Sequence, residues 1–354
     1  MGNPLKFAIF LFGIRELPDR AGIIATLDIV GNIVRHYTKF KAVEIVNKSV
    51  KAVVVGLGQI GYLNNNNEYK LTHYANLLNH FEIKVRFGVD RLSENCAKFT
   101  SQTGIKALTS IDEIRENVDL VVIAVTNESH LQVLFQSIEK LNAKFIICEK
   151  PLGSNFLETS KIVDLCKTNG ALLFVPYFRR YLPEMIEIKE IIENKIYGNI
   201  SEVVISYGQG LVQNGCHFIN LADFLLNGLI AQNIDLKGVQ DSNNPSFDVK
   251  YPNFKMKVIG LDSIENRTGE IRILFEKGQV NIMSGGSLII HGPSDSGSRW
   301  LTHSPSIRSY KWEKGMEEFY KAIMPTILNP EHYNWNDVNS AIRTREIMSK
   351  VLGE

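Results

Sequence analysis

Lys150 and His217 are the residues of this chain best suited to acid–base chemistry. Lys150 stands in Glu149-Lys150-Pro151, directly after the apolar run Phe145 to Cys148, so it lies at the carboxyl end of an expected strand. A lysine is not needed for packing there, and an amine at such an edge can donate or accept a proton. The alternative interpretation, a solvated loop lysine, stays open.

His217 follows a glycine-punctuated loop, Gly208 to Gly215, and stands near the start of an apolar helix. The positive end of the helix dipole should lower the pKa of this histidine and favour neutral imidazole. Neutral imidazole can hydrogen-bond a hydroxyl or carbonyl group and exchange its proton. Three amides nearby, Gln213, Asn214 and Asn220, indicate a polar substrate pocket, although a lone histidine is more often structural.

A glycine-rich turn indicates where a pyrophosphate would bind. The run Lys51 to Val55 is typical of a buried strand, and it ends at Gly56-Leu57-Gly58-Gln59-Ile60-Gly61, a G-x-G-x-x-G spacing. Gly56 permits the tight turn, Gly58 lets phosphates approach the backbone, and Gly61 lets the next helix pack closely. These glycines alone are a weak signal, and a turn without a ligand is the alternative.

An acidic residue strengthens the case for a dinucleotide. The second apolar strand, Ile83 to Val89, ends at Asp90, which can accept a hydrogen bond from a ribose 2′-hydroxyl. Asp90 lies further along than the usual ~20 residues, and the polar run from Asn64 to Lys70 explains the excess as an inserted loop. A carboxylate repels a 2′-phosphate, which favours NAD over NADP, while the adjacent Arg91 keeps NADP open.

Other polar residues follow the ends of the later strands. Thr126, Asn127 and His130 come after the run Leu120 to Val125, where loops meet the nicotinamide side of a dinucleotide. The predicted cofactor contacts are Gly56, Gly58, Gln59, Ile60, Gly61, Asp90, Arg91, Thr126, Asn127, His130 and Glu149. The predicted substrate contacts are Tyr177, Arg180, Asn214 and Asn220, although a domain-linker salt bridge is an equal possibility for Arg180. No metal site is predicted, because the His and Cys residues lack ligand spacing.

The pattern of elements predicts an α/β fold in two parts. Strands alternate with helices over residues 50–177, which predicts a doubly wound parallel (Rossmann) sheet with ligands beyond the carboxyl ends of its strands. Over residues 178–354 strands follow one another with little helix between them, which predicts an open, largely antiparallel sheet. Residues 1–49 form an extension with one amphipathic helix expected between Asp19 and Lys39.

Composition narrows the class of protein. The 354 residues are 44% hydrophobic and 22% charged with a net charge of +1, so nothing favours nucleic acid or an anionic membrane surface as a partner. The four cysteines lie far apart without a C-x-x-C, which predicts a reducing compartment and no disulfides. No apolar stretch approaches the ~18 residues of a membrane span. We therefore expect a cytoplasmic protein.

With these features in order, the chain from about Val50 onward resembles the glucose-fructose oxidoreductase / inositol dehydrogenase / rhizopine catabolism family of NAD(P)-dependent oxidoreductases. The motifs that carry the resemblance are the glycine turn, Thr72-His73, Val89-Asp90, Asp119 to Val125 with His130, Cys148-Glu149-Lys150-Pro151, Arg179-Arg180-Tyr181-Leu182-Pro183, Gly198-Asn199-Ile200 and Asn214-Gly215-Cys216-His217. The resemblance implies that Lys150 and His217 work beside a sugar or cyclitol hydroxyl while hydride passes to or from nicotinamide. It also implies a Lys150-Pro151 bond that is often cis, and an open sheet that forms the interface of a homo-oligomer.

The chain departs from the family where Gln213 and Asn220 stand in place of common aspartates. Amides bind hydroxyls but cannot stabilise an imidazolium, so the proton relay would rest chiefly on Lys150. The run from Gly208 to His217 looks most like a subgroup associated with surface-polysaccharide and nucleotide-sugar metabolism. The main hypothesis is an oxidoreductase acting on a sugar, nucleotide sugar or cyclitol, and the alternative is a non-catalytic NAD(P)-binding sensor.

Overall fold

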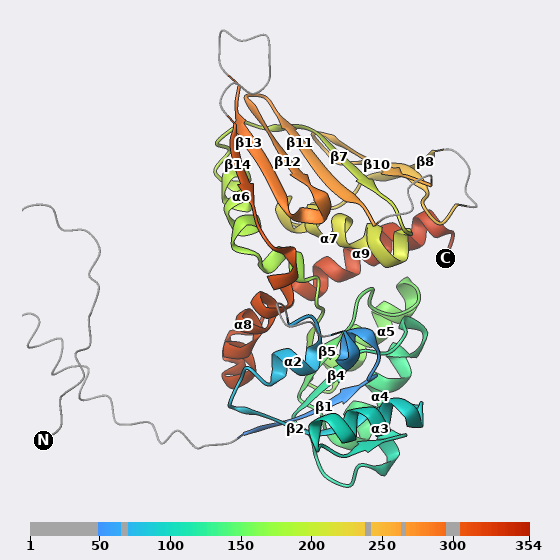
Figure 1. Ribbon diagram of the computed structural model, residues 1–354. Helices are drawn as coiled ribbons and strands as arrows, with labels where there is room; N and C mark the ends of the chain where they lie inside the picture. Colours follow the sequence, from blue (N-terminus) through green and yellow to red (C-terminus); the bar gives the residue numbers. More distant parts are fainter. Residues whose placement is uncertain (1–48, 65–69, 238–241, 263–266, 295–304) are drawn as a thin grey trace, which may run out of the picture. The chain divides into compact units, whose positions relative to one another are not determined.

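The computed structural model describes residues 49–64, 70–237, 242–262, 267–294 and 305–354. Residues Ser49–Glu354 form one compact unit, drawn in colour in Figure 1. The helix expected between Asp19 and Lys39 lies outside the described residues, as does most of the loop expected between Asn64 and Lys70.

The first sheet of this unit is parallel throughout its described strands. Its strands are β1 Val50–Val55, β2 Ile83–Val89, β3 Ala107–Leu108, β4 Leu120–Ile123, β5 Phe145–Cys148 and β6 Leu172–Phe174. They lie in the order β3-β2-β1-β4-β5-β6, so the strand order reverses between β1 and β4 (Figure 1). In such sheets ligands bind beyond the carboxyl ends of the strands at this reversal, so the predicted Rossmann sheet is confirmed.

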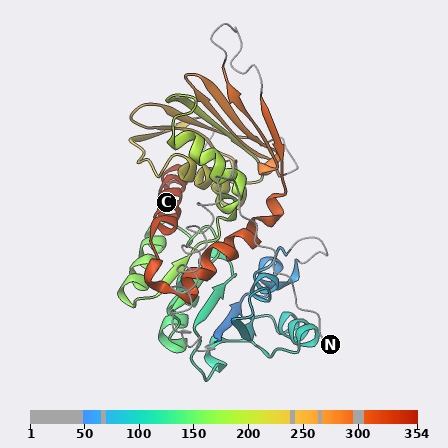
Figure 2. The same cartoon turned by 90° about the vertical axis from the view of Figure 1, so that its left-hand side faces the viewer.

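Helices cover both faces of the first sheet, which explains why its strands are apolar without alternation. The helices are α2 His73–Leu77, α3 Ser93–Thr103, α4 His130–Leu141, α5 Phe156–Thr168 and α8 Gly315–Leu328. Side chains of α4 and α5 pack in one core, and side chains of α2 and α8 pack with Phe99 of α3 in another. Helix α8 is thus a late segment of the chain that returns to cover an early sheet (Figures 1 and 2).

The second sheet is largely antiparallel, as predicted. Its strands are β7 Ile200–Tyr207, β8 Asn233–Lys237, β9 Ser246–Lys250, β10 Lys255–Gly260, β11 Gly269–Phe275, β12 Gly278–Met283, β13 Leu288–Pro293 and β14 Ser306–Ser309. They lie in the order β14-β13-β12-β11-β7-β10-β9-β8, and only the pairing of β7 with β10 is parallel among the described strands. Buried residues alternate along β12, which is typical of a sheet with one covered face.

Three longer helices lie against the second sheet: α6 Pro183–Glu193, α7 Cys216–Leu225 and α9 Asn336–Leu352 (Figure 2). Short helical turns connect many of the elements. These turns are η1 Gln59–Leu63, η2 Ile111–Glu113, η3 Asn127–Ser129, η4 Phe178–Tyr181, η5 Leu211–Gly215, η6 Ser284–Gly286, η7 Trp312–Lys314 and η8 Pro330–His332. Several of them, η1, η4, η5 and η7 in particular, carry the residues of the candidate site.

Candidate active site

The three glycines after β1 occupy three different environments, as the predicted roles require. Gly56 has φ +93°, and a Cβ there would lie 2.4 Å from the carbonyl oxygen of Ala124. A Cβ on Gly61 would lie 1.9 Å from the carbonyl oxygen of Gly56. A Cβ on Gly58 would meet no atom within 4 Å, so this backbone faces open space. The turn therefore fits a pyrophosphate at Gly58, while packing accounts for Gly56 and Gly61.

A cavity of about 650 Å³ opens beside this turn at the carboxyl ends of β1, β2 and β4. Among the predicted cofactor contacts, those that line it are Gly56, Gly58, Asp90, Arg91 and Thr126. Asp90 accepts hydrogen bonds from the backbone N–H of Leu57 at 2.8 Å, from that of Leu92 at 2.9 Å and from the amide of Asn95 at 3.0 Å. A carboxylate has about four acceptor positions, so one remains for a ribose hydroxyl.

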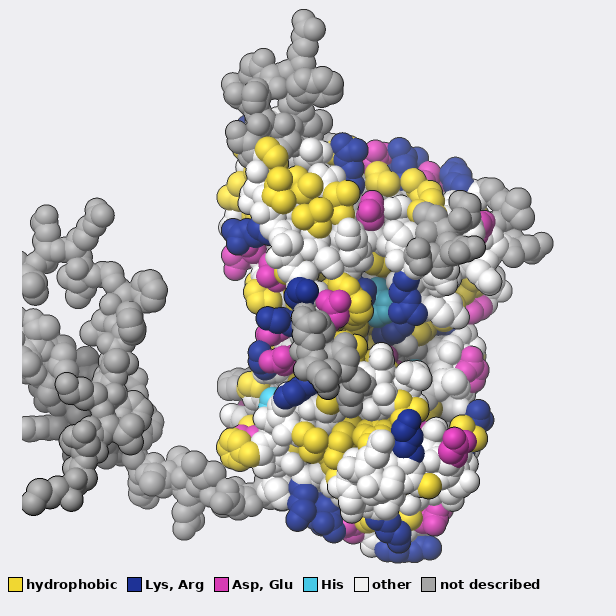
Figure 3. Space-filling model, viewed as in Figure 1, with side chains coloured by type: hydrophobic (Ala, Val, Ile, Leu, Met, Phe, Trp, Pro, Cys, Tyr) yellow, Lys and Arg dark blue, Asp and Glu magenta, His cyan; other side chains and the backbone are white. Residues whose placement is uncertain are grey.

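A second cavity, of about 580 Å³, contains the chemistry-bearing side chains. Among the predicted site residues it is lined by Gln59, Ile60, Glu149, Lys150, Asn214 and His217. Val125, just beyond β4, lines both cavities, so they meet at the reversal of strand order. Figure 3 shows a histidine with lysine or arginine side chains gathered midway along the visible face of the molecule. A single elongated ligand could therefore reach from Asp90 to Lys150.

The side-chain amine of Lys150, just after β5, is fixed by one hydrogen bond. The Lys150-Pro151 peptide bond is cis, as the resemblance implied. The Nζ of Lys150 donates a hydrogen bond at 3.1 Å to the carbonyl oxygen of Gln213, in the turn η5 that leads into α7. This contact joins the strand end to the segment that carries His217.

His217 is the second residue of α7 and its side chain is only 9% exposed. Its ring lies 6.0 Å from the ring of Tyr177 and 5.7 Å from that of Phe178, between centroids. Burial is the main cause that lowers its pKa well below 6.5, and the charges of Lys150 and Arg179 lower it further. This direction agrees with the neutral imidazole expected from sequence, with burial rather than the helix dipole as the principal cause.

Glu149 contacts a histidine that the sequence analysis gave no role in chemistry. Oε1 of Glu149 lies 2.9 Å from Nε2 of His73, whose Nδ1 lies 2.8 Å from the hydroxyl of Tyr320 on α8. Burial alone would raise the pKa of Glu149, but the hydrogen bond and charge of His73, with Lys150, outweigh it and lower that pKa. Oε2 accepts the backbone N–H of Lys150 at 3.1 Å. The ionised carboxylate thus positions the lysine backbone.

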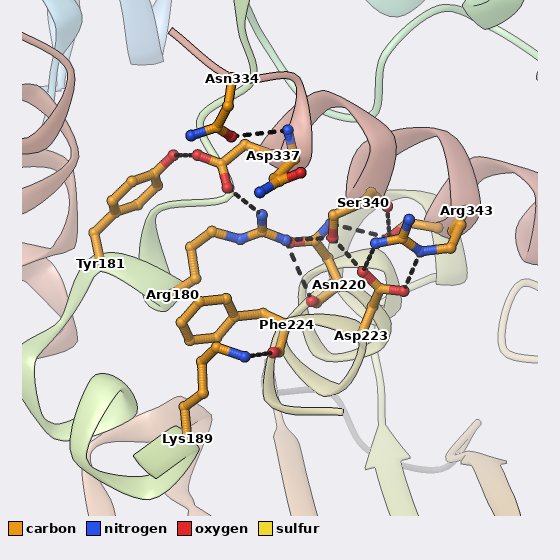
Figure 4. A network of polar contacts seen from close by, with 12 residues as sticks. Arg180, Tyr181, Lys189, Asn220, Asp223, Phe224, Asn334, Asp337, Ser340 and Arg343 are labelled. Atoms are coloured by element: carbon orange, nitrogen blue, oxygen red, sulfur yellow. Dashed lines mark hydrogen bonds and ion pairs between the residues drawn. The ribbon is translucent and has the colours of Figure 1, made fainter. Parts of the chain in front are cut away.

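Two of the predicted substrate contacts, Arg180 and Asn220, belong to a buried polar network away from both cavities (Figure 4). Nη1 of Arg180 donates to Asp337 at 2.9 Å, and Nη2 donates to Asn220 and Ser340. Nδ2 of Asn220 donates to Ser340 and to Thr344 at 3.0 Å. We therefore correct their assignment: they join η4 and α7 to α9, a contact that no local sequence pattern encodes.

The arginine that lines the cavity is the preceding one, Arg179. Its Nε donates at 2.9 Å to the carbonyl oxygen of Gly285, and its guanidinium carbon lies 5.1–5.3 Å from three ring centroids. Those rings belong to Phe178, Phe218 and Trp312. Burial, and to a smaller extent the charge of Arg267, lowers the pKa of Arg179 to about 10, so the group stays cationic at neutral pH. Of the arginine pair, Arg179 lines the cavity, whereas Arg180 forms an ion pair with Asp337 of α9, the alternative that the sequence left open.

His130 and Asn127, two further predicted cofactor contacts, are not among the residues that line either cavity. His130 is buried; its Nε2 donates to the carbonyl oxygen of Val125 at 3.2 Å, and its Nδ1 accepts the N–H of Gly153 at 3.3 Å. These contacts hold the loops around the cavities, which corrects the assignment of His130 as a cofactor contact. Asn127 begins the turn η3 just after Thr126.

Asn214 and Tyr177 differ in their access to the second cavity. Asn214 lines it, and its amide nitrogen donates to the carbonyl oxygens of Gly208 at 2.8 Å and Thr268 at 2.7 Å. Tyr177 is buried beside the ring of His217, and its hydroxyl has no hydrogen-bond partner among the described residues. Asn214 therefore keeps its predicted place, whereas Tyr177 packs behind the histidine.

Within the described residues no group of three or more His, Cys, Asp or Glu side chains is arranged to hold a metal ion. All four cysteines are buried and free. None of the helices in the described part of the chain is long and apolar enough to cross a membrane.

Comparison with known proteins agrees with this geometry. Residues 50–177 match the sequence profile of the Gfo/Idh/MocA proteins, described as an oxidoreductase family with an NAD-binding Rossmann fold. This segment belongs to that family. The family resemblance drawn from the motifs is thereby confirmed for this segment, which contains the open turn at Gly58 and the carboxylate of Asp90.

Individual relatives extend the comparison. An uncharacterised oxidoreductase of Schizosaccharomyces pombe is 30% identical over 158 residues, 44% of this chain and 40% of the relative. An inositol 2-dehydrogenase/D-chiro-inositol 3-dehydrogenase of Lactiplantibacillus plantarum is 29% identical over 149 residues, 41% of each chain. The chain thus matches about two fifths of these curated relatives' length.

A solved structure matches a larger share of the fold. KijD10, a 3-ketoreductase from Actinomadura kijaniata in complex with NADP and TDP-benzene, has a TM-score of 0.68 at 12% identity. The match covers 85% of this chain and 96% of that one, so both sheets share its fold.

Proposed function

We propose that this chain is an NAD(P)-dependent oxidoreductase that acts on a CH–OH group of a sugar, nucleotide sugar or cyclitol. One observation carries the proposal: Lys150 and His217 line the same cavity, and that cavity meets the dinucleotide cradle at Val125. Beside a nicotinamide site, an amine can exchange the hydroxyl proton and a neutral imidazole can hydrogen-bond the reacting oxygen.

The residues divide the work of the reaction. Bound NAD(P) supplies the hydride acceptor, or the donor in the reverse direction, at its nicotinamide ring. In reduction a carbonyl group gains a hydride at carbon and a proton at oxygen, and we assign that proton to the ammonium of Lys150. In oxidation the CH–OH group loses a hydride from carbon and a proton from oxygen, and the deprotonated amine of Lys150 accepts the proton. His217, neutral because it is buried, hydrogen-bonds the reacting oxygen and fixes its orientation. Glu149 and His73 position the lysine.

The names of the relatives are consistent with this substrate class. One is an inositol dehydrogenase, and the other, a ketoreductase, was crystallised with a thymidine-diphosphate compound. Asp90, with one acceptor position remaining, supports NAD as the preferred cofactor, while Arg91 in the same cavity keeps NADP open.

The direct test is hydride exchange by the purified full chain. NAD, NADP and their reduced forms are incubated with a panel of sugars, nucleotide sugars, cyclitols and their keto forms, and absorbance is followed at the reduced-nicotinamide band. We expect a change with at least one substrate. Cofactor binding without turnover on any member of the panel would overturn the proposal.

A second function, a non-catalytic NAD(P) sensor, is favoured by one observation. The carboxylates that line the His217 cavity in the described residues are Glu149, which is engaged with His73, and Glu313. Gln213 and Asn220 supply none, so imidazolium would be poorly stabilised. The same panel separates the two functions.

We also propose that the chain forms a homo-oligomer through the uncovered face of the second sheet. Ile259 alternates with buried Val258 on β10, so it points away from the covering helices, and it is 41% exposed. Light scattering on the full chain would give a mass above that of one 40.0 kDa chain.

A further inference from the structure

The second cavity carries more positive charge than its own carboxylates neutralise. Its described lining includes three cations, Lys150, Arg179 and Arg267, and two carboxylates, Glu149 and Glu313. Glu149 is already hydrogen-bonded to His73 and to the backbone of Lys150. The three cations exceed the two carboxylates by one, so the region around His217 keeps a net positive charge.

Arg179 has an unfulfilled hydrogen-bond donor in this region. The residue is 7% exposed and lines the cavity, and its Nε is bonded to the carbonyl oxygen of Gly285. Its Nη1 is buried and has no partner among the described residues. A buried guanidinium N–H without an acceptor has an unfavourable desolvation free energy. A ligand oxygen that accepts a hydrogen bond from it would therefore be stabilised.

Aromatic rings hold the guanidinium of Arg179 in place. Its carbon lies 5.1 Å from the ring centroid of Phe178, 5.2 Å from that of Phe218 and 5.3 Å from that of Trp312. The rings of Phe178 and Trp312 are stacked, with centroids 6.0 Å apart and an interplanar angle of 19°. Such packing limits rotation of the side chain before a ligand arrives, and a fixed guanidinium is suited to a planar or tetrahedral oxyanion.

We propose that Arg179 and Arg267 form an oxyanion-binding subsite, and that the substrate is a sugar carrying a carboxylate or a phosphate. This inference rests on the proposed function, because it narrows the substrate class of the same cavity. The phosphates of the dinucleotide do not account for these arginines, because Gly58 lines the other cavity and Arg179 does not. The oxyanion binds at the arginines while a hydroxyl of the same molecule reaches Lys150.

The test compares four substrates that share one hexose: the neutral sugar, its uronate, its 1-phosphate and its nucleoside diphosphate derivative. We expect kcat/KM to be at least about 10-fold higher for one or more of the anionic members than for the neutral sugar, since a charged hydrogen bond is lost without the anion. The uronate arm reports a carboxylate, and the two phosphorylated arms report a phosphate. Equal kcat/KM on all four substrates would refute the subsite.

Arginine variants assign the effect to the subsite. Arg179→Gln should raise KM for the preferred anionic substrate about 10- to 100-fold, leave kcat within about threefold, and leave NADH affinity unchanged, with partial recovery in Arg179→Lys. Arg267→Gln changes an exposed residue, so it is expected to fold normally and to raise the same KM. Arg272→Gln, an exposed arginine on β11 whose Nη2 donates to Gln279, is the matched control and should change nothing.

Two outcomes separate this inference from the proposed function. If the arginine variants weaken NADH binding and leave the substrate KM unchanged, the arginines serve the dinucleotide and the inference fails while the function stands. If no member of the panel is turned over, the function fails, and thermal unfolding of the NADH-bound chain with inorganic phosphate or glucuronate decides the subsite. Saturable stabilisation that is lost in Arg267→Gln supports the subsite, and its absence in the wild type refutes it.

Discussion

Replacing Lys150 with alanine should abolish most turnover and leave the fold and the cofactor site intact. The amine makes one hydrogen bond in the described structure, to the carbonyl oxygen of Gln213, and Lys150 itself lines a cavity that water can enter. The free energy of unfolding should therefore fall by only about 1 kcal/mol or less. Loss of the proton-transfer group should lower kcat by about 10²-fold or more, which is about 2.7 kcal/mol of transition-state stabilisation.

The assay combines steady-state kinetics on the best substrate of the panel, NADH affinity by fluorescence, and thermal unfolding. Lys150→Arg keeps the charge but not the readily exchanged proton, so it should resemble the alanine variant in kcat. Lys161→Ala, on the exposed side of α5, is the matched control and should behave as wild type. If kcat of Lys150→Ala stays within threefold of wild type, Lys150 does not carry the proton and the proposed mechanism is wrong.

The glycine turn and the buried histidine give two further predictions. Gly58→Ala should keep the wild-type Tm but weaken NADH binding by about 10-fold or more, because its Cβ would lie in open space; Gly61→Ala should lower the Tm, because its Cβ would collide with the carbonyl oxygen of Gly56. Calorimetry and NADH titration check both, and a Gly58→Ala chain with normal NADH affinity would contradict the assignment of the cradle. The low folded-state pKa of His217 means that the unfolded chain binds the extra proton, so stability should fall as pH drops below 6.5. Urea unfolding should show a shallower decline for His217→Gln, and identical pH profiles would rule this out.

Much of the fold could be predicted because its strands are either continuously apolar or clearly alternating. Strands β2 and β5 have the bounds expected from sequence. Strands β8, β9 and β14 were not predicted. β8 and β14 are exposed edge strands with polar residues, so neither apolar pattern appears in them, and β9 is only five residues long with two buried apolar side chains.

The role of a site residue could be predicted where its position along a strand or helix determines it. It could not be predicted where a contact with a residue far away in the sequence determines it. Lys150 follows β5, so the topology of the first sheet brings it to the edge where ligands bind. His217 begins α7, outside that sheet, and only the family resemblance predicted that it lies beside Lys150. The choice between Arg179 and Arg180 depends on α9, whose Asp337 and Ser340 bind the second arginine from more than 150 positions away. The role of His73 likewise depends on Tyr320, which belongs to a helix near the other end of the chain.

Helix α8 makes the early and late parts of the chain depend on each other. A fragment ending at residue 177 would contain every strand of the first sheet, yet the face that Phe319 and Ile323 cover would be left bare to water. The same truncation would remove Tyr320, whose hydroxyl contacts the imidazole of His73. That imidazole in turn contacts Glu149, the carboxylate that positions the lysine. Residues 50–177 are recognisable as the cofactor-binding segment, but that segment is packed completely only after α8, Gly315–Leu328, has been synthesised.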